Sequence, residues 1–156
     1  MNSIKIALCQ MNVVDNKEKN IEKAIQMIKE SKNKGADLAV LPEMFNCPYE
    51  NEKFIEYAEI LEDSQTLMEI SDIAKEENIH VLAGSIPELE RDDEKGTESI
   101  YNTSVFFDNA GNPLGKHRKM HLFDIDVLFH FKTPYFDEIS VDACWHPLTP
   151  EHGFPS

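Results

Sequence analysis

Apolar and polar residues alternate in several short segments of the chain, and between these segments apolar residues recur at helical spacing. Residues 4–9 alternate, which predicts a strand, and both of its faces are apolar enough to be covered. The continuous apolar run at residues 38–41 predicts a second strand that is buried on both faces and stops at Pro42. Residues 79–83 predict a third strand.

Amphipathic helices are expected between these strands. The first helix lies between the first two strands, where Asp15 or Asn16 can cap its start and Gly35 can end it. Two more helical patterns follow Pro42, and Ser64 can cap the second of them. The apolar positions are Ile21, Ala24, Ile25 and Ile28 in the first helix, Phe54, Tyr57, Ala58 and Leu61 in the second, and Leu67, Ile70, Ile73 and Ala74 in the third.

The next part of the chain predicts an antiparallel hairpin. Residues 100–107 and 113–119 are strand-like and flank residues 108–112, which are rich in turn formers. Residues 88–98 are too charged to be buried, and we interpret them as a solvated loop. The order of the elements predicts one α/β domain with mixed strand directions and a right-handed crossover between its first two strands.

This pattern ends near Val127. From Leu128 onward the chain has four prolines, no helical stripe and no strand of useful length. We therefore expect a domain at residues 1–127 and a divergent tail at residues 128–156, which is either frameshifted or disordered.

Length, composition and charge exclude several classes of protein. The 156 residues, of which 41% are hydrophobic and 28% charged, fit one globular domain. The formal net charge of -14 repels phosphate groups, so we expect no binding to nucleic acid or to a membrane surface. The chain has no run of about 20 apolar residues and no signal sequence, and we expect it to be cytoplasmic. Its cysteines, Cys9, Cys47 and Cys144, are too far apart to favour a disulfide scaffold or a zinc site.

One carboxylate stands at a position where α/β proteins build their sites. Glu43 directly follows the predicted strand at residues 38–41, at its carboxyl end. Partial desolvation there would raise the pKa of this carboxyl group and suit it to proton transfer. From position alone, however, a solvated residue at a strand end is the favoured interpretation.

A basic cluster lies at residues 115–119 and passes at once into apolar residues. As an exposed hairpin edge, such a cluster blocks edge-to-edge pairing of sheets. The apolar residues that follow indicate instead that one cation is drawn inward, where an ammonium group could stabilise an oxyanion. His117 and His121 would share a strand face, but no further ligands match them, and we do not expect a metal site.

Six short motifs stand in a fixed order along about four fifths of the chain. They are KIALCQM (5–11), ADLAVLPEMF (36–45), NCPY (46–49), AGSIPE (83–88), YNTS (101–104) and HRKMHLFDID (117–126). In this order the chain resembles the nitrilase superfamily of carbon-nitrogen hydrolases, in particular its omega-amidase-like branch. The resemblance implies the N-terminal half of an α-β-β-α sandwich with a mixed sheet, truncated in this chain.

The resemblance also implies a chemistry and its residues. Glu43 corresponds to the general base, Lys119 to the cation that stabilises the tetrahedral intermediate, and Tyr49 to a residue that helps to shape the substrate pocket. The third catalytic member of the family is a cysteine that attacks a small-molecule, non-peptide amide and forms an acyl-enzyme. No metal and no organic cofactor is implied.

The chain departs from the family at the nucleophile. The family's cysteine lies in a Gly-x-Cys-Tyr-Asp type motif, which this sequence lacks. Cys144 has an aromatic neighbour but stands too close to Lys119 and lacks the glycine, so we interpret it as an ordinary thiol rather than a displaced nucleophile. We therefore expect an omega-amidase-like hydrolase that is inactive as a truncated chain. The alternative is a non-catalytic α/β interaction module that uses an exposed sheet face, for example to form a homo-oligomer.

Overall fold

The chain consists of two compact units, Met1–Arg118 and Lys119–Ser156, whose positions relative to one another are not determined. A computed structural model describes residues 3–120 and the backbone of residues 129–133 and 136–141. Among the described residues, none of the helices is both long enough and apolar enough to span a membrane.

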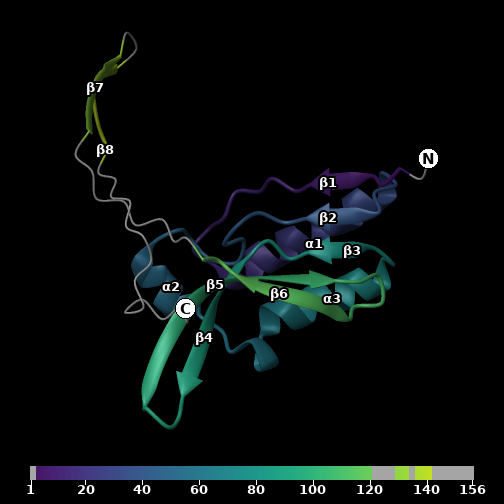
Figure 1. Ribbon diagram of the computed structural model, residues 1–156. Coiled ribbons are helices and arrows are strands. Elements are labelled where there is room, and N and C mark those ends of the chain that lie inside the picture. Colours follow the sequence, from purple (N-terminus) through teal and green to yellow (C-terminus); the bar gives the residue numbers. More distant parts are fainter. Residues whose placement is uncertain (1–2, 121–128, 134–135, 142–156) are drawn as a thin grey trace. The chain divides into compact units, whose positions relative to one another are not determined.

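The first unit is built on one mixed six-stranded sheet (Figure 1). Strands β1, β2 and β3 are parallel neighbours, and β5 runs antiparallel to β3, β4 and β6. The α/β fold with mixed strand directions is therefore confirmed. The strands are β1 (Ile6–Leu8), β2 (Leu38–Val40), β3 (His80–Leu82), β4 (Ile86–Asp92), β5 (Thr97–Phe107) and β6 (Pro113–Arg118).

The helices begin where the sequence predicts caps. Asn16 caps α1 (Lys17–Asn33) by accepting a hydrogen bond from the Lys19 amide, and Gly35 lies just beyond its end with φ of 77°. Ser64 caps α3 (Gln65–Glu76) in the same way. The middle pattern is shorter than predicted, because α2 (Asn51–Tyr57) ends before Ala58 and a separate 3-10 turn, η1, covers Leu61–Asp63.

One face of the sheet is covered by α1 and α3 (Figure 1). The apolar stripes of both helices pack against this face. Every second residue of a strand points to the same face of a sheet, so the strands contribute residues from alternate positions to this core. This core contains Ala24 and Ile28 of α1, Ile70 and Ala74 of α3, and Ala39, Val81, Ala83, Val105 and Phe107 of the sheet or its strand ends.

The other face of the sheet is far more open, so the expectation that the first two strands are covered on both faces is wrong. Ile6 is 50% exposed and Leu8 is 80% exposed, while Leu38 and Val40 are only half-buried. The reason is that α1 and α3 both pack against the opposite face.

The charged segment at residues 88–98 is not a loop, as its composition had predicted. It forms most of a long hairpin in which β4 and the start of β5 pair residue by residue from Ile86 and Thr103 to Asp92 and Thr97. The hairpin extends beyond the rest of the sheet (Figure 1). Opposite charges lie across it, as in the 2.9 Å pair of Arg91 and Glu98, and such cross-strand pairs stabilise an exposed ribbon.

The second unit contains a two-stranded antiparallel ladder of β7 (Phe129–Thr133) and β8 (Phe136–Val141). The prediction that residues 128–156 hold no strand of useful length is therefore wrong. The alternation of Phe129-His130-Phe131-Lys132 indicates a strand, but it is short. The prolines near it favoured irregular structure, and the prediction followed the prolines.

Candidate active site

Glu43 lies just beyond the carboxyl end of β2, on a turn that the neighbouring strand holds in place. Met44, the next residue, has φ of 51°, a conformation that is uncommon for a residue with a side chain. Its amide donates to Ser85 Oγ at 3.1 Å, which fixes this turn against the segment that follows β3. Backbone strain of this kind is typical of functional sites.

Two donors from different elements meet at one oxygen of Glu43. Asn102 Nδ2 on β5 donates to Glu43 Oε1 at 2.7 Å, and Tyr49 Oη donates to the same atom at 3.2 Å. The Tyr49 ring is in edge-on contact with Phe54 of α2, with ring centroids 5.2 Å apart. The structure therefore brings Glu43 and Tyr49 together, as two of the predicted site residues, and adds Asn102.

The expected desolvation of Glu43 is not found. The carboxylate is exposed, and the ring of Tyr49 beside it is 55% exposed, whereas Asn102 is only 6% exposed. Within the first unit, the sheet therefore contributes a buried donor, Asn102, to an exposed carboxylate.

A groove of about 590 Å³ in the first unit lies elsewhere, between α3 and β6. Its walls include Leu67, Met68, Phe107 and Leu114, and Glu43 and Tyr49 are not among the residues that line it. The groove is therefore separate from the group of residues around Glu43.

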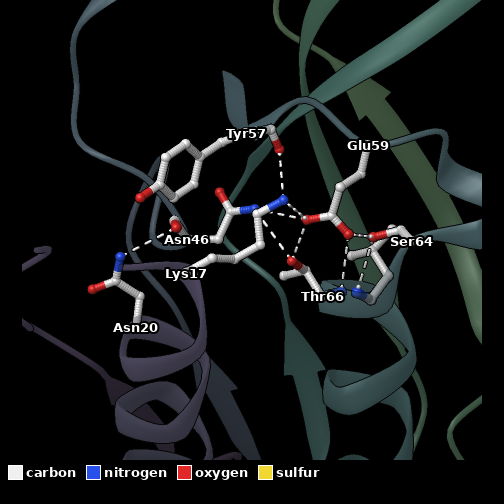
Figure 2. Close-up of polar contacts among 8 residues, drawn as sticks. Lys17, Asn20, Asn46, Tyr57, Glu59, Ser64 and Thr66 are labelled. Atoms are coloured by element: carbon white, nitrogen blue, oxygen red, sulfur yellow. Dashed lines mark hydrogen bonds and ion pairs between the residues drawn. The ribbon is translucent and has the colours of Figure 1, made fainter. Parts of the chain in front are cut away.

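The loop that connects Glu43 to Tyr49 is anchored at Asn46 by Glu59, a half-buried residue whose side chain is 10% exposed (Figure 2). Glu59 Oε1 accepts hydrogen bonds from Lys17 Nζ at 3.1 Å and Asn46 Nδ2 at 3.2 Å. On the other side of the carboxylate, Oε2 accepts from Ser64 Oγ at 2.9 Å and from the Thr66 amide at 3.1 Å. Burial raises the pKa of Glu59, but the hydrogen bonds from Thr66 and Lys17 outweigh it, so the pKa lies below its ordinary value.

Asn46 is the residue through which Glu59 holds the loop in place. Its side chain is fully buried, and it also donates to Thr66 Oγ1, while its backbone carbonyl accepts from Asn20 Nδ2 at 3.1 Å. The start of α1 and the start of α3 are thereby joined to the segment between Glu43 and Tyr49. This explains the asparagine of the NCPY motif as a structural residue.

A buried carboxylate, Glu88, holds the end of β6. Arg118 Nε and Nη2 donate to the two oxygens of Glu88 at 2.8 and 2.7 Å, and Glu88 is only 4% exposed. Burial raises the pKa of Glu88, but the hydrogen bonds from Arg118 and Thr103 outweigh it and leave the pKa below its usual range. The cation that is drawn inward in the first unit is therefore Arg118, whose guanidinium also lies 3.9 Å from the Tyr101 ring.

Lys119 follows Arg118 directly and is half-buried. It is also the first residue of the second unit, so its position relative to Glu43 is not determined. Its catalytic role stays a prediction.

The two described cysteines are free thiols inside the first unit. Cys9 is in contact with Ser31 Oγ at 3.7 Å within the main core. Cys47 is 1% exposed, and burial raises the pKa of its thiol to about 11. Neither environment suits a nucleophile, which needs an accessible thiolate. Cys144 lies outside the described residues.

Sequence reasoning missed three functional or supporting residues, Asn102, Glu59 and Glu88. Asn102 had one usable signal, since asparagine is depleted in strand interiors and yet stands in the middle of a predicted strand. Glu88 had none, because its partner Arg118 lies 30 residues away. Glu59 has near partners in Ser64 and Thr66, but its charged partner, Lys17, lies in the distant helix α1.

Known proteins of one family match most of this chain. The family model described as carbon-nitrogen hydrolase matches residues 5–147. The chain is 46% identical over 123 residues to nitrilase homolog 2 of Dictyostelium discoideum, and 41% identical over 127 residues to an omega-amidase of Bos taurus. These matches cover 79% and 81% of this chain but only 36% and 44% of the two relatives. The chain thus spans less than half the length of either relative.

Solved structures match the same part of the chain. Nit3 of Saccharomyces cerevisiae, a member of branch 10 of the nitrilase superfamily, has a TM-score of 0.67 and 35% sequence identity, with 76% of this chain and 44% of that chain covered. An amidase from Nesterenkonia sp. has a TM-score of 0.65 at 20% identity, with 78% of this chain and 44% of that chain covered, and at this identity the likeness concerns the fold alone.

Proposed function

The chain belongs to the carbon-nitrogen hydrolase family, and from this premise we propose that it carries the base of an omega-amidase-type site, with Glu43 as that base. The observation that carries the proposal is the convergence of Asn102 and Tyr49 on Glu43, at the carboxyl end of a parallel strand. The substrate class is a small non-peptide amide, in line with the omega-amidases among the chain's relatives.

In the proposed chemistry, Glu43 takes the proton of a cysteine thiol, and the thiolate attacks the amide carbonyl carbon. The tetrahedral intermediate collapses with loss of ammonia, which leaves with a proton returned by Glu43. Water, deprotonated by the same carboxylate, then hydrolyses the thioester and releases the acid. The exposed position of Glu43 leaves room for substrate beside it.

Lys119 is the proposed cation for the oxyanion of the intermediate. Its support is its place in the HRKMHLFDID motif, directly after the last residue of β6.

The nucleophile limits what this chain does by itself. Cys9 and Cys47 are buried, and Cys144 lacks the family's sequence context. We therefore propose that the 156-residue chain does not form an acyl-enzyme, and that its catalytic groups act only together with a cysteine-bearing segment.

Two linked assays test this function. The chain alone is incubated with a small omega-amide of a 2-oxo dicarboxylate, and no ammonia above background is expected. In a second assay, residues 1–120 of this chain replace the matching N-terminal part of the Bos taurus omega-amidase. This chimera is expected to release ammonia. Because oxyanion stabilisation contributes about 100- to 1000-fold, Lys119→Ala is expected to lower kcat of the chimera by a similar factor.

The matched control is Lys95→Ala, which removes an exposed lysine on the β4–β5 turn and is expected to leave kcat unchanged. A chimera that folds as the relative does but releases no ammonia would contradict the proposal. So would ammonia release by the chain alone that survives Glu43→Gln.

A second candidate function rests on the open face of the sheet. Ile4 and Leu8 are 66% and 80% exposed, and apolar surface of this kind is typical of interaction sites. In this proposal two copies of the chain pair through that face as a homo-oligomer. Light scattering at rising concentration tests it, with Leu8→Lys expected to dissociate the dimer and Ile55→Lys, at an exposed position of α2, expected to leave it intact.

We also propose that the protein acts in the cytoplasm. The free thiols of Cys9 and Cys47 support this location, because unpaired cysteines persist in reducing compartments. Subcellular fractionation of cells that express the chain tests it, and recovery in a membrane or secreted fraction would contradict it.

A further inference from the structure

We infer that Asn102 and Tyr49 are positioning residues that fix the orientation of Glu43 and favour its ionised form by donating hydrogen bonds to the same oxygen, Oε1. The inference rests on the proposed function, because it explains how an exposed carboxylate can serve as a base. It assigns Asn102 a role that the YNTS motif alone did not indicate.

The position of Asn102 is fixed by the strand that carries it. Asn102 lies in β5 opposite Pro87 of β4, and it is 6% exposed. Its neighbours Tyr101 and Thr103 turn to the face where Arg118 and Glu88 meet. Period-two alternation therefore directs the Asn102 side chain away from that ion pair and towards Glu43.

The chemistry of the contact determines which form of Glu43 it stabilises. The 2.7 Å bond from Asn102 Nδ2 uses an amide N–H, which donates but cannot accept. A donor on a carboxylate oxygen favours the ionised form. A base must be ionised in the resting protein, so this contact favours the form that the proposed reaction needs.

Tyr49 adds a second donor from an independent direction. It lies six residues beyond Glu43 on the loop anchored by Asn46, and its ring rests edge-on against Phe54. A glutamate side chain on the surface normally samples several rotamers. Two donors from separate elements at one oxygen restrict this sampling, so the carboxylate plane is held without being buried.

The test follows the Glu43 titration by NMR in the full 156-residue chain with 13C-labelled glutamate. The Glu43 carboxyl signal is assigned by its loss in Glu43→Gln. In Asn102→Leu the titration midpoint is expected to move upward by about half a pH unit or more, because the ionised form loses a donor. Tyr49→Phe is expected to move it upward by less, since that bond is longer.

The matched control is Asn109→Leu, which removes an exposed asparagine whose side chain bonds Asn78. This variant is expected to leave the Glu43 midpoint unchanged. A folded Asn102→Leu chain with the same midpoint as the unmodified chain would overturn the inference.

A measurement on the unmodified chain removes any dependence on how Asn102→Leu folds. The side-chain amide signals of Asn102 are expected to shift with pH at the Glu43 midpoint, and to lose this shift in Glu43→Gln. Amide signals that do not follow Glu43 would overturn the inference. Because these readouts need no turnover, they stay decisive even where the amidase assays fail, and a positive titration does not by itself support the amidase function.

Discussion

Gly84 and Pro42 approach each other so closely that a Cβ atom on Gly84 would lie 2.0 Å from the Pro42 carbonyl oxygen. Pro42 precedes Glu43, and Gly84 precedes Ser85, which accepts the Met44 amide. The AGSIPE motif is thus explained by contact between the carboxyl ends of β2 and β3, where the glycine admits the backbone and the serine holds the turn.

Gly84→Ala is expected to destabilise the fold by at least about 2 kcal/mol, because the added methyl group meets backbone and because φ at this position is 44°. Urea unfolding followed by circular dichroism measures the loss. Gly115→Ala is the control, since a Cβ there meets nothing within 4 Å, and a change below about 0.5 kcal/mol is expected. Equal stability of the two variants would contradict the close approach.

Glu88→Ala is expected to cost about 3 kcal/mol, because it leaves Arg118 without its main partner in a largely buried place. Glu98→Ala breaks the Arg91–Glu98 pair of the same hairpin, whose side chains are 57% and 60% exposed, and a loss below about 1 kcal/mol is expected. Thermal and urea unfolding compare the two. A larger loss of unfolding free energy for Glu98→Ala than for Glu88→Ala would contradict the assignment of the Glu88–Arg118 pair as the contact that holds the end of β6.

Acid is expected to destabilise the first unit through Glu59 and Glu88. The folded-state pKa of each lies below the ordinary carboxyl value of 4.5, so the stabilisation that each contributes is complete above that value and is lost as the pH falls below it. The free energy of unfolding should therefore fall steeply between about pH 5 and pH 3. A Glu59→Gln, Glu88→Gln chain should start lower at pH 7 and show a flatter profile. A profile as steep as that of the unmodified chain would assign the acid sensitivity to other carboxylates.

Cys47 is expected to react very slowly with thiol reagents. With a thiol pKa of about 11, about one molecule in a thousand is thiolate at pH 8, and the side chain is 1% exposed. In a Cys9→Ala, Cys144→Ser chain, in which Cys47 is the remaining cysteine, the rate of reaction with a colorimetric disulfide reagent in buffer is compared with the rate in denaturant. Rapid reaction of Cys47 in the folded chain would reopen its candidacy as a nucleophile.

Local patterns in the sequence were sufficient for α1, α3 and the first three strands of the first unit, but not for the hairpin of β4 and β5, whose charged residues were predicted as a loop. Cap residues such as Asn16 and Ser64 act within a few positions of themselves, and the apolar stripes of α1 and α3 show directly which helix face is buried. What the sequence could not reveal depends on distant partners. Glu88 is charged and yet buried only because Arg118 reaches it from another strand.

In the candidate site, too, one residue could be predicted from its local sequence and the others could not. Glu43 could be found from its place after an apolar strand, but its exposure and its donor Asn102, 59 positions away, depend on the tertiary fold. The open face of β1 was also unpredictable, because the alternation of Ile4, Ile6 and Leu8 is the same whether or not another layer covers them.

The most direct test of the account is kcat of the chimera that joins residues 1–120 to the remaining part of the Bos taurus omega-amidase, measured with and without Glu43→Gln. A loss of kcat of at least about 100-fold with little change in KM is expected, because the substitution removes a general base. The control Glu62→Gln, at an exposed carboxylate of η1, should retain full activity. A Glu43→Gln chimera that keeps kcat within a factor of about two would contradict the assignment of Glu43 as the base.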